Sequence, residues 1–131
     1  MTDTLSIIFA QLNQSVGDIA ANAAAMLAVR ARHPHADLIV FPEMQLIGYP
    51  PEDLVMKPAL IARAAQEMAA LAAITADGGP AMPVGSALRV DGALYNGVVL
   101  LDGGAQAAVR LKHELPNYGT FDEKRYFSAG P

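Results

Sequence analysis

Glu43 is the first side chain in this sequence whose position suits it to chemistry. It follows the apolar stretch DLIVF and a single proline, in the segment FPEMQLIGYP. A carboxylate at the apolar rim of a strand can act as a general acid or base, because its surroundings tune its affinity for the proton. The same glutamate could instead be solvated or cap a nearby backbone amide. Position alone leaves both interpretations open.

Lys112 and Glu123 lie in a second polar segment, KHELPNYGTFDEKRYF. A lysine held beside a reacting carbonyl would stabilise a developing oxyanion, and a second carboxylate would orient that lysine and an acid. The alternatives are a lysine whose stem covers apolar surface while its ammonium reaches water, and a glutamate that is an ordinary surface charge. Tyr118, in the turn PNYG, could project into a cleft or pack that turn against the domain.

The sequence predicts neither a metal site nor a nucleotide site within these residues. His33 and His35 flank a proline, and His113 lies far along the chain without a second ligand at useful spacing. The glycines lack the spacing and the lysine of a phosphate-binding loop. The sequence has no cysteine, so a cysteine nucleophile would have to come from residues outside it.

Charge and hydropathy argue against two classes of partner. The net charge is −4 and there is no run of lysines or arginines, so we expect no nucleic acid partner. The N-terminal stretch carries an acid where a signal peptide would be positive, and no apolar run approaches the roughly 20 residues of a membrane helix. We therefore expect no membrane partner and a cytoplasmic protein.

The first part of the chain reads as a strand, a helix and a second strand. Residues 5–12 form a short apolar run, and Asp18 can cap a helix over the alanine-rich stretch that follows it. That helix should stop near the His33-Pro34 pair, because the residue before a proline is disfavoured in helices. Residues 37–41 give the second strand, so a βαβ unit of an α/β protein is predicted and Glu43 lies in the loop after it.

The second part of the chain reads as a helix and an antiparallel meander. The loop 42–58 contains Gly48 and two adjacent prolines, which exclude regular structure through its middle. A helix over 59–76 ends at the turn DGGP. Three strands follow, joined by Asp-Gly turns; they are expected over 82–90, 93–102 and 105–115.

The two polar segments resemble the first two sequence blocks of the nitrilase superfamily of carbon-nitrogen hydrolases. Glu43 in FPEMQLIGYPPEDL matches the family's glutamate, and Lys112 in LKHELPNYGTFDEKRYF matches its lysine. The PNYG insertion and GYPPEDL are similar to the glutaminase domain of glutamine-dependent NAD synthetases. The resemblance implies a four-layer αββα sandwich that pairs into homo-oligomers. Residues 1–131 would be its N-terminal portion, ending before the nucleophilic cysteine and the synthetase domain.

The resemblance also implies a role for each site residue. The family's cysteine would attack the side-chain amide of glutamine with Glu43 as its base, and Lys112 would stabilise the tetrahedral intermediate. Glu123 would hold both in place, while Tyr118 and Tyr49 would contact the glutamine. No cofactor is implied for residues 1–131; ATP and magnesium would belong to the C-terminal synthetase domain of the same chain.

Two other functions stay open on the sequence alone. A stand-alone amidase of the same superfamily would share Glu43 and Lys112 but have no synthetase domain. A non-catalytic interaction module would keep the fold and use the charged segment as a contact surface. In either enzyme interpretation, the 131-residue chain by itself is expected to be inactive, because it has no cysteine.

Overall fold

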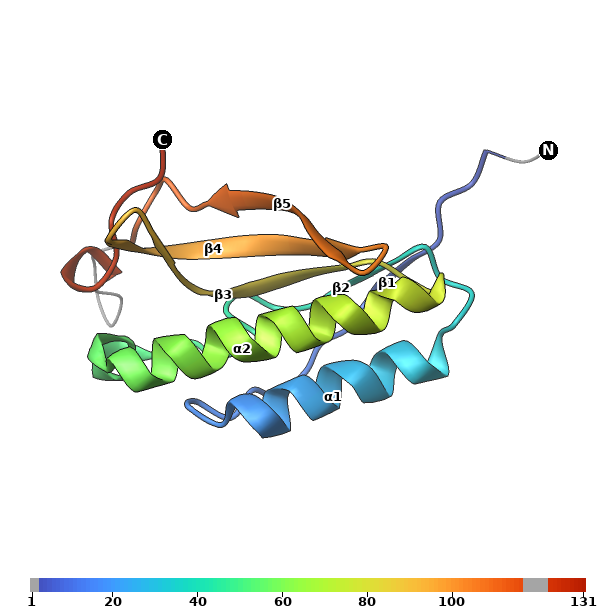
Figure 1. The fold of residues 1–131 in the computed structure, drawn as a ribbon, viewed down its shortest axis with the longest axis horizontal. Helices are drawn as coiled ribbons and strands as arrows, with labels where there is room; N and C mark the ends of the chain where they lie inside the picture. Colours follow the sequence, from blue (N-terminus) through green and yellow to red (C-terminus); the bar gives the residue numbers. More distant parts are fainter. Residues whose placement is uncertain (1–2, 117–122) are drawn as a thin grey trace.

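Two helices lie side by side against one face of a sheet in the computed structural model, which describes residues 3–116 and 123–131 (Figure 1). Regular elements alternate along the chain as an α/β protein requires. They are β1 (Ile7–Phe9), α1 (Ile19–Arg32), β2 (Leu38–Val40), the 3-10 turn η1 (Glu52–Met56), α2 (Pro58–Ile74), the 3-10 turn η2 (Thr75–Asp77), β3 (Met82–Val90), β4 (Ala93–Asp102), β5 (Ala105–Leu111) and the 3-10 turn η3 (Glu123–Arg125).

The predicted βαβ unit is confirmed. Strands β1 and β2 pair in parallel with Ile8 opposite Ile39, and Asp18 caps α1 by accepting a 3.1 Å hydrogen bond from the amide of Ala21. Helix α1 ends at Arg32, directly before the His33-Pro34 pair. Both strands are shorter than predicted, since only three residues of each are paired.

The predicted antiparallel meander is also confirmed, with β4 between β3 and β5. The amide of Ile39 donates to the carbonyl of Ala81 at 3.0 Å, which joins β2 to the start of β3. Strand β5 ends at Leu111, so the prediction that it runs to residue 115 is wrong. The Lys112 amide still donates to the carbonyl of Asn96 on β4 at 2.8 Å, but the Lys112 carbonyl accepts from the amide of Gly130 at 2.9 Å.

The core lies between the helices and the face of the sheet that they cover. Side chains that both layers direct into this space are fully or nearly fully buried: Met26, Met68 and Leu71 from the helices, and Ile39, Met82, Val84, Val99 and Leu101 from the strands. On the opposite face Phe9 is 75% and Val98 41% exposed, because strand side chains alternate between faces. The described residues thus form one helix layer and one sheet layer, which is half of the expected αββα sandwich.

Helix α2 requires one correction to the sequence analysis. Together with η2 it spans 20 residues, Pro58–Asp77, and is long and apolar enough to cross a membrane by length and composition. The prediction that no apolar run approaches that length is therefore wrong. A core helix has the same composition: α2 buries Met68 and Leu71, and carries an ion pair between Arg63 and Glu67 at 2.7 Å.

An ion pair connects α1 to η2, the 3-10 turn that follows α2. The guanidinium of Arg30 donates two 2.8 Å hydrogen bonds to the Asp77 carboxylate and one of 3.0 Å to the carbonyl of Pro80. Hydrogen bonds from Arg30 and from the amide of Gly79 hold the pKa of Asp77 well below its usual range. The hydrogen bond to Asp77 likewise raises the pKa of Arg30, against the effect of its burial.

Candidate active site

A tight turn after β2 positions Glu43. The amide of Gly48 donates to the carbonyl of Met44 at 2.7 Å, and Met44 adopts a left-handed conformation with φ of 54°. The turn lies directly on β3, where a Cβ atom on Gly85 would come within 2.7 Å of the Met44 amide nitrogen. Glycine at 85 is therefore what allows the backbone next to Glu43 to approach the sheet this closely.

The side chain of Gln14 holds the two ends of this turn together. Its Nε2 donates to the carbonyl of Glu43 at 2.8 Å, and its Oε1 accepts from the amide of Tyr49 at 2.7 Å. Sequence reasoning missed Gln14, since a glutamine in the loop after a first strand carries no sign of its distant partners. Its effect is to fix the Glu43 backbone relative to Tyr49.

Lys112 meets Glu43 across 69 residues of sequence. Its Nζ lies 3.2 Å from Oε1 and 3.0 Å from Oε2 of Glu43. Its backbone amide donates to the carbonyl of Asn96 at 2.8 Å, so Lys112 stands beside Asn96 just past the end of β5. The ammonium of Lys112 is therefore paired with a carboxylate, while 28% of the lysine side chain stays exposed.

Glu123 completes the cluster from the 3-10 turn η3. Its side chain is only 5% exposed, and Oε1 accepts from Lys112 Nζ at 2.9 Å and from the hydroxyl of Tyr49 at 2.7 Å. A surface charge would be solvated, so that alternative for Glu123 is excluded. Its orientation comes from backbone bonds, such as the 2.8 Å contact between the amide of Phe127 and its carbonyl.

Lys112 is a fixed cation in this cluster. Burial lowers the pKa of its ammonium, but hydrogen bonds and charge attraction from Glu123 and Glu43 outweigh burial and raise the pKa above the ordinary lysine value. Two carboxylates thus flank one ammonium. Such an arrangement can accept a proton at a carboxylate while it presents a positive group to a developing oxyanion.

A cavity of about 290 Å³ opens beside the cluster on the sheet face that the helices leave uncovered. Glu43 is accessible there, with 44% of its side chain exposed. The lining residues are Glu43, Asn96, Gly97, Val98, Arg110, Leu111 and Lys112. A small polar substrate could therefore reach both the carboxylate and the ammonium.

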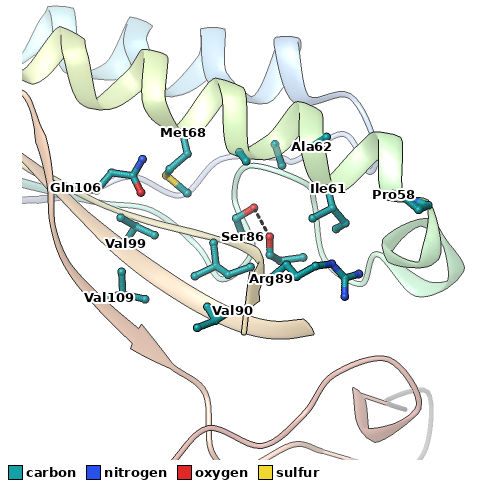
Figure 2. Close-up of a pocket in the computed structure, with 14 residues that line it drawn as sticks. Pro58, Ile61, Ala62, Met68, Ser86, Arg89, Val90, Val99, Gln106 and Val109 are labelled. Atoms are coloured by element: carbon teal, nitrogen blue, oxygen red, sulfur yellow. Dashed lines mark hydrogen bonds between the residues drawn. The ribbon is translucent and has the colours of Figure 1, made fainter. Parts of the chain in front are cut away.

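A larger cavity, of about 420 Å³, lies between α2 and the β3–β5 meander (Figure 2). Its lining is mostly apolar, with Ile61 and Met68 from the helix facing Val99 and Val109 from the sheet. No acidic residue occurs among the described side chains that line it. Glu43 and Lys112 instead line the smaller cavity on the other face of the sheet.

The structure brings together four of the predicted site residues and leaves one undescribed. Glu43, Lys112, Glu123 and Tyr49 are linked by the contacts above, whereas Tyr118 lies outside the described residues. Within residues 3–116 and 123–131, no group of three histidine or acidic side chains could hold a metal ion. Asn96 was missed; its only sequence signal is a polar residue inside the apolar strand β4.

The α/β layer carries a cluster in which one ammonium lies between two carboxylates, and such a cluster suits acid–base and oxyanion chemistry. The chain belongs to the carbon-nitrogen hydrolase family, whose model matches residues 9–131. The resemblance drawn from the two polar segments is thereby confirmed.

Within this family, the chain is similar in sequence to glutamine-dependent NAD(+) synthetases. The chain is 47% identical over 133 residues to the glutamine-dependent NAD(+) synthetase of Rhodobacter capsulatus, covering 100% of this chain and 24% of that protein. It is 38% identical over 128 residues to the enzyme of the same name from Thermotoga maritima, covering 96% of this chain and 22% of that protein. The chain thus spans about a quarter of the length of these relatives.

Solved structures agree with the fold. The glutamine-dependent NAD(+) synthetase from Cytophaga hutchinsonii matches with a TM-score of 0.90 and 27% identity, covering 98% of this chain and 22% of that one. The synthetase from Acinetobacter baumannii, in complex with ADP, matches at 0.85 with 36% identity, covering 97% and 24%. A Nesterenkonia amidase from the nitrilase superfamily matches at 0.79 with 22% identity, covering 97% and 49%, and supports the nitrilase-type fold alone.

Proposed function

We propose that this chain supplies the base and the oxyanion-stabilising cation of a centre that hydrolyses glutamine in a glutamine-dependent NAD synthetase. The observation that carries the proposal is the meeting of Glu43 and Lys112 at 3.0 Å across 69 residues of sequence. It occurs in a chain that is 47% identical to one such synthetase. The cluster lies beside a cavity large enough for a small amide.

The first half-reaction would form a thioester. A cysteine outside these residues gives its proton to Glu43, and the thiolate attacks the side-chain amide carbon of glutamine. Lys112 stabilises the negative charge on the amide oxygen in the tetrahedral intermediate. As that intermediate collapses, the carbon–nitrogen bond breaks and Glu43 returns its proton to the leaving ammonia.

The second half-reaction would release glutamate. Glu43, ionised again, takes a proton from water, and the hydroxide attacks the thioester carbon. The carbon–sulfur bond then breaks, and the thiolate recovers the proton from Glu43. Glu123 is buried and contacts Lys112, but it is not itself exposed to the cavity; its role is to hold the ammonium in place, with Tyr49 and Tyr118 contacting the glutamine.

The ammonia would be consumed elsewhere in the same protein. In the proposal, a C-terminal synthetase domain uses ATP and magnesium to amidate nicotinic acid adenine dinucleotide to NAD, in a homo-oligomeric cytoplasmic protein. The 131 residues alone would release no ammonia from glutamine, because their sequence contains no cysteine.

The test uses the full-length protein that carries this segment, with ATP, magnesium and the deamido dinucleotide. Glu43→Gln and Lys112→Met should abolish NAD formation from glutamine and leave NAD formation from free ammonia intact. Glu67→Gln, on α2 and outside the carboxylate–lysine cluster, is the control. Persistent glutamine use in both site variants would contradict the proposal. Hydrolysis of simple amides without NAD formation from either nitrogen source would instead identify a stand-alone amidase.

A further inference from the structure

Asn96 is a buried polar residue inside an apolar strand. It is 3% exposed and stands on β4, where its carbonyl accepts from the amide of Lys112 at 2.8 Å. This backbone pairing places the two residues next to each other on adjacent strands. Because neighbouring residues across a sheet direct their side chains to the same face, the Asn96 amide points where the Lys112 ammonium points.

The side-chain amide of Asn96 faces both carboxylates of the cluster. Its Nδ2 lies 3.0 Å from Oε2 of Glu43 and 3.5 Å from Oε2 of Glu123. An ionised carboxylate only accepts hydrogen bonds, so the NH₂ group and not the carbonyl must point toward it. The two N–H bonds diverge by about 120°, which lets one nitrogen donate to acceptors on both sides.

These contacts make the two oxygens of Glu43 unequal. Oε2 accepts from Lys112 Nζ at 3.0 Å and from Asn96 Nδ2 at 3.0 Å, which engages both of its lone pairs. Oε1 has one contact among the described residues, the longer 3.2 Å approach of Lys112 Nζ. Within the part of the chain that the structure describes, a lone pair on Oε1 is therefore left for a proton donor that enters the cavity.

We propose that Asn96 is a positioning residue that fixes the Glu43 carboxylate so that Oε1 is the oxygen that takes and returns the proton. The inference rests on the proposed amide hydrolysis and deepens it. Lys112 alone could not fix this choice, because its ammonium contacts both oxygens at nearly the same distance. Of the two Glu43 oxygens, the Asn96 amide contacts Oε2, so the two oxygens are no longer equivalent.

The test compares Asn96→Leu, which is similar in size but has no donor, with Asn96→Asp, which keeps the shape but can only accept when ionised. Both are made in the full-length protein. We expect kcat for glutamine hydrolysis to fall by about 10- to 100-fold, with KM for glutamine changed by less than about threefold. NAD formation from free ammonia should stay unchanged in both variants.

The pH profile separates positioning from a structural role. Besides Asn96, the described polar groups around the Glu43 carboxylate are Lys112 and, through Lys112, Glu123; Arg110 lines the same cavity. Loss of a donor to the ionised carboxylate should move the acidic limb of the kcat/KM profile to higher pH, and further in Asn96→Asp than in Asn96→Leu, because Asp adds a negative charge.

The outcomes separate a failure of the proposed function from a failure of the role given to Asn96. If the wild-type protein does not hydrolyse glutamine, the proposed function itself fails. If it does, but Asn96→Leu and Asn96→Asp keep the wild-type kcat and pH profile, the inference about Asn96 fails alone. Loss of cooperative thermal unfolding in both variants would also overturn it, since Asn96 would then serve the core and not the carboxylate.

Discussion

The hydroxyl of Tyr49 donates a 2.7 Å hydrogen bond to Oε1 of Glu123 across 74 residues of sequence. A second contact, 2.9 Å from the Tyr126 hydroxyl to Oδ1 of Asp53, joins the same two segments nearer the solvent. The loop after Glu43 and the segment that contains Glu123 therefore pack against each other. The Tyr49 hydrogen bond keeps the buried Glu123 carboxylate within hydrogen-bond distance of the Lys112 ammonium.

Tyr49→Phe should lower glutamine hydrolysis about tenfold in the full-length protein. The substitution removes a hydrogen bond to a buried carboxylate, and bonds to charged groups contribute about 1.5–3 kcal/mol. Steady-state ammonia release gives the rate, and thermal unfolding shows whether the fold is kept. Tyr126→Phe is the matched control, because its hydroxyl donates to an Asp53 side chain that is 79% exposed. An equal loss in the control would contradict a specific role for Tyr49.

Gly85→Ala should lower the rate of glutamine hydrolysis even at temperatures where the variant is fully folded. The new Cβ would lie 2.7 Å from the Met44 amide nitrogen, so the turn that carries Glu43 must move, at a cost of about 1–3 kcal/mol. Gly92→Ala is a control of similar cost, about 1–2 kcal/mol, since Gly92 has φ of 82° and no atom near its Cβ position.

Ammonia release and thermal unfolding are measured on both glycine variants, to separate a displaced Glu43 turn from a loss of stability. Gly85→Ala should lose most of its activity at temperatures where it is fully folded, whereas Gly92→Ala should keep it. Equal activity in the two folded variants would show that the position of the Glu43 turn does not depend on Gly85.

Local signals predicted most of the fold. The bounds of α1 follow from Asp18 and the His33-Pro34 pair, both of which act within one turn of the helix. The predicted end of β5 was wrong because the carbonyl of Lys112 accepts from the amide of Gly130, 18 residues further along the chain. A bond between residues so far apart leaves no mark on the local sequence pattern.

The site was predictable only in part, for the same reason. Glu43, Lys112 and Glu123 were predicted because their residue types and the motifs around them indicated chemistry. Asn96 and Gln14 were missed because their importance depends on the register of β4 against β5 and on the path of the turn after β2. Neither feature is local, so a single polar residue in an apolar stretch could not be assigned a partner.

Lys112→Met should destabilise the protein by about 1–3 kcal/mol near neutral pH, because the buried Glu123 loses its cation. The raised pKa of Lys112 gives the sign of the pH dependence. A group whose pKa is higher in the folded state contributes stability below the unfolded value, 10.5, and loses it as the pH rises through the folded value. Urea unfolding of both proteins should therefore show the difference shrinking above pH 10.5; a constant difference would contradict the ion pairs.

Asp77→Asn should destabilise the helix layer and leave the active site unchanged. The pKa of Asp77 is lowered by Arg30 and the Gly79 amide, so its contribution is complete above the unfolded value of 3.8 and is lost as the pH falls below it. Thermal unfolding should show a lower midpoint for the variant than for the wild-type protein at neutral pH, and the difference between the two midpoints should close in acid.

The control is Glu67→Gln, which breaks the pair with Arg63 and should change the midpoint little. If both substitutions lower the unfolding midpoint equally, the two hydrogen bonds from the nearly buried Arg30 to Asp77 stabilise the fold no more than the pair on α2 does. If Asp77→Asn reduces glutamine hydrolysis while folded, the helix layer and the carboxylate cluster are coupled in a way that their separate hydrogen-bond networks do not explain.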